Sequence, residues 1–215
     1  MPPASPSPSI DLATTATRTR ILKQARLDFF SHGYSNVTMD ALAGELGMSK
    51  KTLYVHFAGK DEIVSAVIDH LAAEIRADAD TLLRNRELNL AEKLRGFVEG
   101  MLERMATLSP RTVRDLQRFA PTLYAKVEEV RGITLPYVFG RFVEEGQVAG
   151  LIRTNLPPGF AIEFFLHAIQ GLMHPAALDR LRVAPRDVIA TGIDLFFGGL
   201  LTNAGRKQYE KLFPR

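Results

Sequence analysis

Apolar residues in this sequence recur at intervals of three and four, the spacing that places side chains on one face of an α-helix. Ile21, Ala25 and Phe29 begin the pattern, and Gly33 ends it. No stretch of five or more residues alternates convincingly between apolar and polar side chains, as a half-buried strand would. We therefore predict an all-α fold.

Helix-start signals divide the chain into segments. Three short helices are expected at 17–33, 38–47 and 50–57, with Thr38 and Ser49 as N-caps of the second and third. Longer helices follow Lys60, and prolines or caps mark where they begin. These starts are Asp61, the Asn89–Glu92 capping box, Ser109-Pro110, Pro121, Pro158 and Pro185. Gly132 and Pro136 are expected to interrupt the helix that begins at Pro121.

Composition excludes several classes of protein. The chain has 215 residues and no cysteine, so it has no disulfide framework, no cysteine zinc site and no thiol nucleophile. It has neither an apolar run long enough for a membrane span nor a secretion signal, and we expect a cytoplasmic protein without a membrane partner. Phosphate-loop, dinucleotide and hydrolase motifs are missing, so we expect no cofactor and no enzymatic activity.

Positive charge is concentrated at one end of the chain. The net charge is +3, and residues 1–60 hold seven Lys or Arg against four Asp or Glu. This end is therefore expected to meet a polyanion. Arg18, Arg20 and Lys23 crowd the start of the first predicted helix, where positive charge opposes the helix dipole, so we expect an anion to compensate them.

The segment 38–57 has the pattern of a helix-turn-helix motif. Ala43 is small enough for two helices to cross closely, and Gly47 can adopt the positive φ of a tight turn. Leu42, Leu46, Met48 and Leu53 would fill the core beneath. The outer face of the third helix then carries donors and an aromatic ring that suit a DNA major groove and its flanking phosphates, namely Lys50, Lys51, Thr52, Tyr54, Val55 and His56.

Residues 21–63 resemble the DNA-binding region of the TetR family of transcriptional regulators. The matching positions are Ala25, Phe29, Gly33-Tyr34, Val37-Thr38, Leu42-Ala43, Leu46-Gly47-Met48-Ser49, Leu53-Tyr54, His56-Phe57 and Lys60. The resemblance implies an N-terminal three-helix DNA-binding domain and a larger helical domain that dimerises and holds an effector pocket. It implies phosphate contacts for the residues Thr38, Tyr54, His56 and Lys60, and base contacts for Lys50, Lys51 and Thr52.

This plan assigns four parts to the chain. Residues 1–16, with four prolines among Ser, Thr and Ala, are predicted to be a disordered tail. Residues 17–63 form the helix-turn-helix domain, 64–205 the helical effector-binding and dimerisation domain, and 206–215 a C-terminal tail. The expected function is a repressor, released from a near-palindromic double-stranded operator by a small apolar or amphipathic effector.

Candidate effector-binding residues come from two sources. Aromatic and methionine stripes, loosened by Pro136, supply Phe97, Met101, Met105, Phe119, Tyr124 and Tyr137. The apolar segment 158–174 adds a polar row of Glu163, His167, Gln170 and His174 on one helix face. We expect His167, Gln170 and His174 to bind the effector, although the same row could border a dimer seam. The alternative is a helical enzyme or metal-binding protein that uses Glu163, His167 and His174.

The last predicted helix is apolar over a broad surface. Two such helices from each of two protomers could form a four-helix bundle about a two-fold axis. The expected dimer residues are Phe165, Ile169, Leu172, Ile189, Ile193, Phe196 and Phe197. The competing interpretation is that the last helix is an internal core helix.

Overall fold

Eleven helices and one isolated β-bridge make up the regular structure of residues 8–212, the part of the chain that this computed structural model describes. The all-α prediction is confirmed. None of these helices is both long and apolar enough to cross a membrane. In chain order they are α1 (Pro8–His32), α2 (Met39–Glu45), α3 (Lys50–His56), α4 (Lys60–Arg84), α5 (Leu90–Arg104), α6 (Pro110–Phe119), α7 (Pro121–Val148), α8 (Pro158–Leu172), α9 (Pro175–Leu181), α10 (Pro185–Leu200) and α11 (Asn203–Leu212).

The predicted capping residues begin the helices. The Thr38 side chain accepts a hydrogen bond from the Ala41 N–H, and the Ser49 side chain accepts one from the Thr52 N–H. Asn89 and Glu92 form both bonds of a capping box at the start of α5. Each bond satisfies a backbone donor that a helix start leaves unpaired.

Both ends of the chain differ from the prediction. Residues 8–16, expected in a disordered tail, form the first turns of α1, while residues 1–7 lie outside the described part. A proline in the first turn of a helix costs little, and an established helix gains one bond for each residue added. The expected C-terminal tail falls largely in α11, where Tyr209 is buried and its hydroxyl donates to Asp194 at 3.0 Å.

The basic cluster of α1 pairs with carbonyl groups of the protein. Arg18 donates to the carbonyl of His56 at the end of α3, and Arg20 donates to that of Leu46 at the end of α2. Because α1 begins at Pro8, these arginines do not lie at its N-terminus. They instead compensate the negative carbonyl ends of two other helices, and our expectation of a compensating anion was wrong for both.

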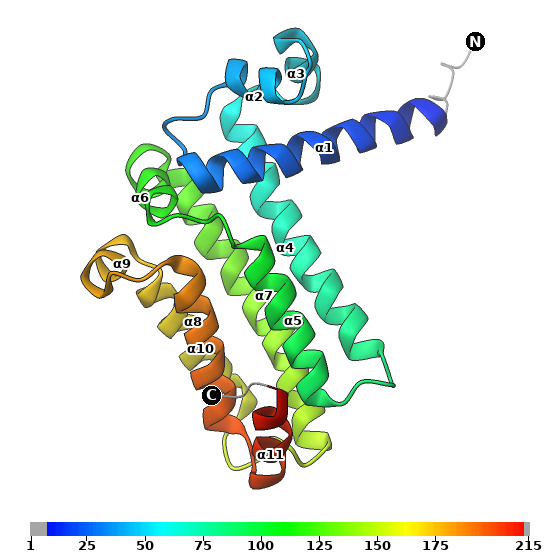
Figure 1. Cartoon of the computed structure of the whole chain (residues 1–215), viewed down its shortest axis with the longest axis vertical. Helices are drawn as coiled ribbons and strands as arrows, with labels where there is room; N and C mark the ends of the chain where they lie inside the picture. Colours follow the sequence, from blue (N-terminus) through cyan, green and yellow to red (C-terminus); the bar gives the residue numbers. More distant parts are fainter. Residues whose placement is uncertain (1–7, 213–215) are drawn as a thin grey trace.

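Two hydrophobic cores share helix α4. The first core joins α1, α2 and α3 to the start of α4, through Ile63, Val64 and Val67, and includes Leu123 of α7. The second core contains Ala79 of α4 and side chains from α5, α7, α8 and α10. In Figure 1, α4 runs from the α2–α3 end down beside α5 and α7. The domain boundary that we placed after residue 63 therefore falls inside a continuous helix.

Phe139 of α7 lies at the centre of the second core. Its ring centroid is 4.8–6.0 Å from those of Phe97, Phe165, Phe196 and Phe197. Helix α7 passes through Gly132 and Pro136 without a break, contrary to the interruption we expected. Packing on several sides maintains the helix there, although Pro136 cannot donate a backbone hydrogen bond.

The apolar residues expected at a dimer seam lie within the protomer. Phe165, Ile169, Ile189, Ile193, Phe196 and Phe197 are buried in the second core, and Leu172 is half-buried against it. The outer surfaces of α8 and α10 carry other apolar side chains. Phe160, Phe164 and Leu195 are 64%, 66% and 70% exposed. The competing interpretation, an internal core helix, therefore describes the inner face of α10.

Candidate functional site

The α2–turn–α3 unit presents one face to solvent. Leu42 and Leu53 are buried beneath it, and Gly47 has a φ of +62° in the turn, as predicted. The exposed side of α3 carries Lys50, Lys51, Thr52, Tyr54 and Val55. Helices α2 and α3 lie at the top of Figure 1, at one end of the molecule. An exposed helix of this length, bearing donors and small apolar groups, can enter a DNA major groove.

Two of these side chains are already engaged within the motif. Lys50 Nζ lies 2.8 Å from Asp40 Oδ2, and this hydrogen bond raises the pKa of Lys50. The Thr52 hydroxyl lies 2.8 Å from that of Ser49, the N-cap of the same helix. Contact with bases would therefore require Lys50 to exchange a carboxylate partner for DNA.

The residues expected at phosphates surround α3. Thr38 begins α2, the half-buried His56 ends α3, and Lys60 begins α4. The Lys60 Nζ donates to the carbonyl of Tyr34 at 3.1 Å and lies 4.0 Å from the centre of the Tyr34 ring. With Lys50, Lys51, Thr52 and Tyr54, these side chains belong to adjoining elements at the same end of the molecule.

Tyr34 connects the segment after α1 to the start of α4, a role that the sequence analysis did not assign to it. Its hydroxyl donates to Asp61 Oδ1 at 2.5 Å, and its ring supports Lys60. Burial, followed by the hydrogen bond to Asp61, raises the pKa of Tyr34 to about 12. Gly33-Tyr34 stood among the matching family positions, which was the one sequence signal for it.

A cavity of about 200 Å³ lies between the two cores. Its walls come from α4, α5, α6, α7, α8 and α10, and Phe29, Phe30 and Tyr34 reach it from the end of α1 and the segment that follows. Of the expected effector residues, Met101, Met105 and Tyr124 line this cavity. Burial, followed by the charge of Glu128, raises the pKa of Tyr124, so its phenol remains protonated at neutral pH.

Six expected effector residues lie elsewhere. Phe97 packs in the core against Phe139, Phe119 is exposed, and the Tyr137 hydroxyl donates to Asp80 at 2.9 Å. His167, Gln170 and His174 are exposed on the outer side of the molecule. The cavity is lined instead by residues that we assigned to the dimer seam, namely Phe165, Ile169, Ile189 and Ile193. On α8, Phe165 and Ile169 therefore point inward to the cavity, whereas the polar row points outward.

The alternative metal site does not form. His167 Nδ1 lies 3.6 Å from Glu163 Oε2, but His174 accepts from the Ala176 N–H at the start of α9, and its Nε2 lies 3.0 Å from Gln117 of α6. Within residues 8–212, no three His, Asp or Glu side chains are grouped so as to hold a metal ion.

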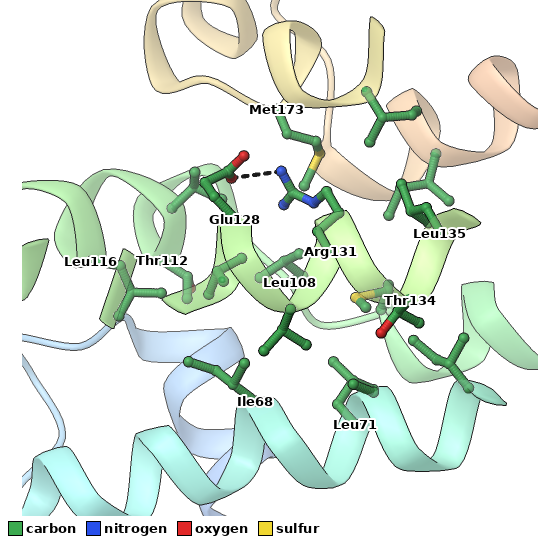
Figure 2. A pocket seen from close by; sticks show the side chains of 18 of the residues that line it. Ile68, Leu71, Leu108, Thr112, Leu116, Glu128, Arg131, Thr134, Leu135 and Met173 are labelled. Carbon is green, nitrogen blue, oxygen red and sulfur yellow. Dashed lines mark hydrogen bonds and ion pairs between the residues drawn. The ribbon is translucent and has the colours of Figure 1, made fainter. Parts of the chain in front are cut away.

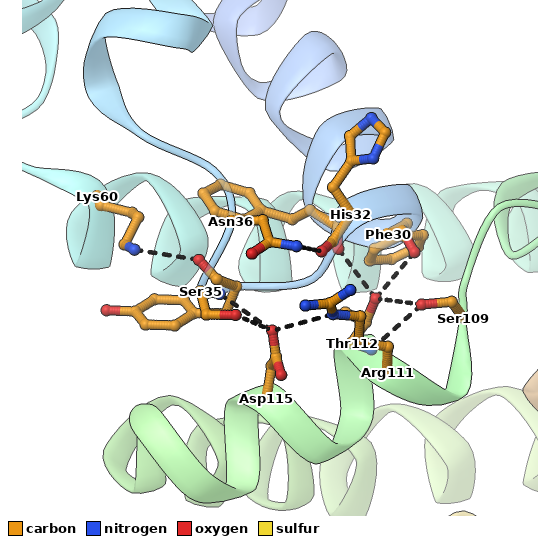
Figure 3. Close-up of polar contacts among 11 residues, drawn as sticks. Phe30, His32, Ser35, Asn36, Lys60, Ser109, Arg111, Thr112 and Asp115 are labelled. Atoms are coloured by element: carbon orange, nitrogen blue, oxygen red, sulfur yellow. Dashed lines mark hydrogen bonds and ion pairs between the residues drawn. The ribbon is translucent and has the colours of Figure 1, made fainter.

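Hydrogen bonds connect α6 to the end of α1 and the segment after it (Figure 3). The Thr112 hydroxyl lies 3.0 Å from the carbonyl oxygen of Phe29 and 2.8 Å from that of Phe30. The Ser109 N–H also donates to Phe30 at 3.1 Å, and Asp115 accepts from Ser35. We name Thr112 and Asp115 of α6, its N-cap Ser109 and their partners the α6 latch. Thr112 also lines the cavity, so one side chain contacts both the cavity and the helix-turn-helix domain.

Comparison with known proteins supports this organisation. Residues 21–67 match the family described as bacterial regulatory proteins, tetR family. An uncharacterised helix-turn-helix transcriptional regulator of Bacillus subtilis, YvaF, is 25% identical over 89% of this chain and 95% of its own length. The transcriptional repressor AcnR of Corynebacterium efficiens is 30% identical over 66% of this chain and 71% of its own.

A solved structure shares the fold of both domains. The regulatory protein TetR from Rhodobacter sphaeroides superposes with a TM-score of 0.64, at 19% identity, over 85% of this chain and 98% of that one. The relatives are transcriptional regulators, and the enzyme alternative has no support among them. The matched motif, its exposed α3 and the 30% identity to AcnR together establish that this chain belongs to the TetR family of DNA-binding transcriptional regulators.

Proposed function

We propose that the protein is a homodimeric repressor that leaves a near-palindromic operator when a small apolar or amphipathic molecule enters the cavity. The observation that carries this proposal is the double role of Thr112, which lines the cavity and also binds carbonyl groups of α1. The relative AcnR is named a repressor, which favours repression over activation. Operator DNA would place the protein in the cytoplasm.

In this proposal α3 reads the operator and its neighbours grip the backbone. Lys50, Lys51 and Thr52 would face base edges, because they lie on the exposed side of the first turn of α3. Thr38, Tyr54, His56 and Lys60 would lie against phosphates. A two-fold protein presents two such faces related by one axis, which is why the operator should be a near-palindrome.

The exposed side of α8 and α10 is our revised dimer surface. Phe160, Phe164 and Leu195 would stay in water in an isolated protomer, and α8 packs against α10 within it. Two copies related by a two-fold axis would cover these side chains in a four-helix bundle. The exposed row of Glu163, His167 and Gln170 would then border that bundle rather than the cavity.

Release of the protein from its operator would follow from movement of α6. A ligand in the cavity contacts Thr112, Val113 and Leu116 of this helix. Displacement of α6 would loosen the α6 latch and with it the position of the helix-turn-helix domain. Such coupling is reciprocal, so a ligand that weakens DNA binding about tenfold must bind about tenfold more weakly to the DNA complex. This factor corresponds to a difference of about 1.4 kcal/mol in binding free energy.

The test begins with the genomic fragments that the purified protein retains. Sequencing them defines the operator, and fluorescence anisotropy with a labelled duplex then measures affinity with and without candidate ligands. We expect a near-palindromic sequence bound by a dimer, and lower affinity when the effector is present. Retained fragments without internal symmetry, or bound by one protomer, would overturn the dimeric model, and a bound ligand that strengthens DNA binding would overturn release.

A further inference from the structure

Two charged side chains lie among the otherwise mainly apolar residues that line the cavity. Glu128 and Arg131 are one turn apart on α7, and Figure 2 shows their side chains joined, with Ile68 and Leu71 of α4 across from them. Arg131 Nη1 lies 2.7 Å from Glu128 Oε1, and the two side chains are only 16% and 19% exposed. Their charges cancel, so the cavity lining has no net charge.

This pairing disfavours a charged ligand. A carboxylate or an ammonium group beside the pair would add a charge that no other side chain of the lining neutralises. One charge would then stay unpaired in largely apolar surroundings, which is strongly unfavourable. A neutral ligand leaves the ion pair intact.

The pair also has hydrogen-bonding capacity left over. Glu128 Oε2 is buried and has no partner among the described residues. The bond to Glu128 uses one nitrogen of Arg131, and a guanidinium has five N–H groups. A buried carboxylate oxygen without a donor is costly, so a ligand that supplies one gains from the bond. A hydroxyl group can donate to Glu128 Oε2 and at the same time accept from Arg131.

We propose that the cavity binds an uncharged, mainly apolar molecule whose single hydroxyl group is held between Glu128 and Arg131. A cavity of about 200 Å³ fits a medium-chain alcohol or an alkylphenol in size. This inference rests on the proposed function only in taking the cavity as the effector site, because ligand binding itself can be measured without DNA.

The test uses isothermal titration of the full chain with four probes of matched length: 1-octanol, heptyl methyl ether, octanoate and octylammonium. We expect 1-octanol to bind best. The ether accepts but cannot donate, so it should bind about tenfold more weakly, and the two ions should be weaker still. Octanoate, octylammonium or the ether binding as well as 1-octanol would overturn the proposal, and so would failure of 1-octanol to bind.

Substitution of Glu128 or Arg131 should change which probe binds best. Glu128→Gln leaves Arg131 unopposed and should favour octanoate over 1-octanol, whereas Arg131→Gln should favour octylammonium. Glu129→Gln, the exposed neighbour on α7, is the matched control and should leave the order unchanged. If either variant does not fold, titration of the four probes into the wild-type protein still tests the proposed ligand class. A separate DNA-binding titration distinguishes the two proposals, because 1-octanol that binds without releasing DNA supports the ligand class and overturns the effector role.

Discussion

Asp115 of α6 accepts two hydrogen bonds from Ser35, in the segment between α1 and α2. The Ser35 N–H donates to Asp115 Oδ2 at 3.1 Å, and the Ser35 hydroxyl donates to the same oxygen at 2.5 Å. Close approach requires glycine at position 33, where φ is +80° and a Cβ would lie 2.6 Å from that oxygen. Helix α6 thus binds the segment that leads into the helix-turn-helix motif through a charged acceptor.

Replacing Asp115 with alanine should weaken the coupling between the cavity and DNA. The variant keeps both binding surfaces and the contacts of Ser109 and Thr112 with Phe30, but it loses the contacts with Ser35, so movement of α6 would shift the segment before α2 less. We expect the ratio of ligand affinities without and with operator to fall below the wild-type ratio. Calorimetric titration of the ligand with and without operator measures this ratio. Glu99→Ala, which removes an exposed ion pair within α5, is the control, and an unchanged ratio in Asp115→Ala would contradict the latch.

The two classes of DNA contact should differ in their response to salt. Lys60→Ala should weaken binding to all duplexes alike and reduce the slope of log affinity against log salt concentration by about 1, because one phosphate contact is lost. Thr52→Val should cost about 1–3 kcal/mol at particular base pairs and leave the slope unchanged. Anisotropy titrations over a salt series separate the two effects. A uniform loss across sequences in Thr52→Val would remove it from base recognition.

Neutralising Asp40 should strengthen DNA binding. Its carboxylate is exposed, pairs with Lys50 at 2.8 Å and would face the phosphates. Asp40→Asn removes a repulsive charge and frees Lys50, so affinity should rise several-fold for operator and unrelated DNA, most strongly at low salt. Asp187→Asn, also in the first turn of a helix but on α10, should have no effect. Weaker binding of Asp40→Asn would mean that Asp40 positions Lys50 for recognition.

Local signals predicted the helix-turn-helix domain well because they act within a few residues. Thr38 and Ser49 cap the helices that follow them, and Gly47 makes the turn with a positive φ. The family resemblance then supplied the arrangement of the domain. The sequence did not predict where α1 starts or how it packs, because the arginine contacts that fix α1 against α2 and α3 join residues far apart in the chain.

Helix faces in the second domain could not be assigned from spacing. Helix α8 is apolar on several sides, so Phe160 and Phe164 looked equivalent to Phe165 and Ile169. Only packing against Phe139 and Phe196 distinguishes the inner pair from the outer one. The contact of Ser35 with Asp115 joins residues 80 positions apart, and serine and aspartate are too common in loops and on helix surfaces to signal it.

Charged substitutions on the outer face of α8 and α10 should produce monomers. Phe164→Glu or Leu195→Glu would place two carboxylates close together across the proposed two-fold axis and remove apolar contact area. Sedimentation velocity should show a monomer, and operator affinity should fall at least about tenfold because the two faces no longer act together. Val148→Glu, at a position 92% exposed on the end of α7, is the control. Dimers that persist in both test variants would move the interface elsewhere.

Two glycines of α7 should respond oppositely to alanine. A Cβ at Gly146 would lie 2.5 Å from Ile152 Cδ1 and 3.0 Å from Leu90 Cδ2, in a buried position. Overpacking of this kind costs about 1–3 kcal/mol. At Gly132 a Cβ would meet nothing within 4 Å, so Gly132→Ala should gain about 0.5–1 kcal/mol from the lower entropy of the unfolded chain. Urea unfolding followed by circular dichroism measures both, with protein concentration held fixed because a dimer's stability depends on it. Equal effects of the two substitutions would show that the close packing of α7 against Ile152 is not what requires glycine at position 146.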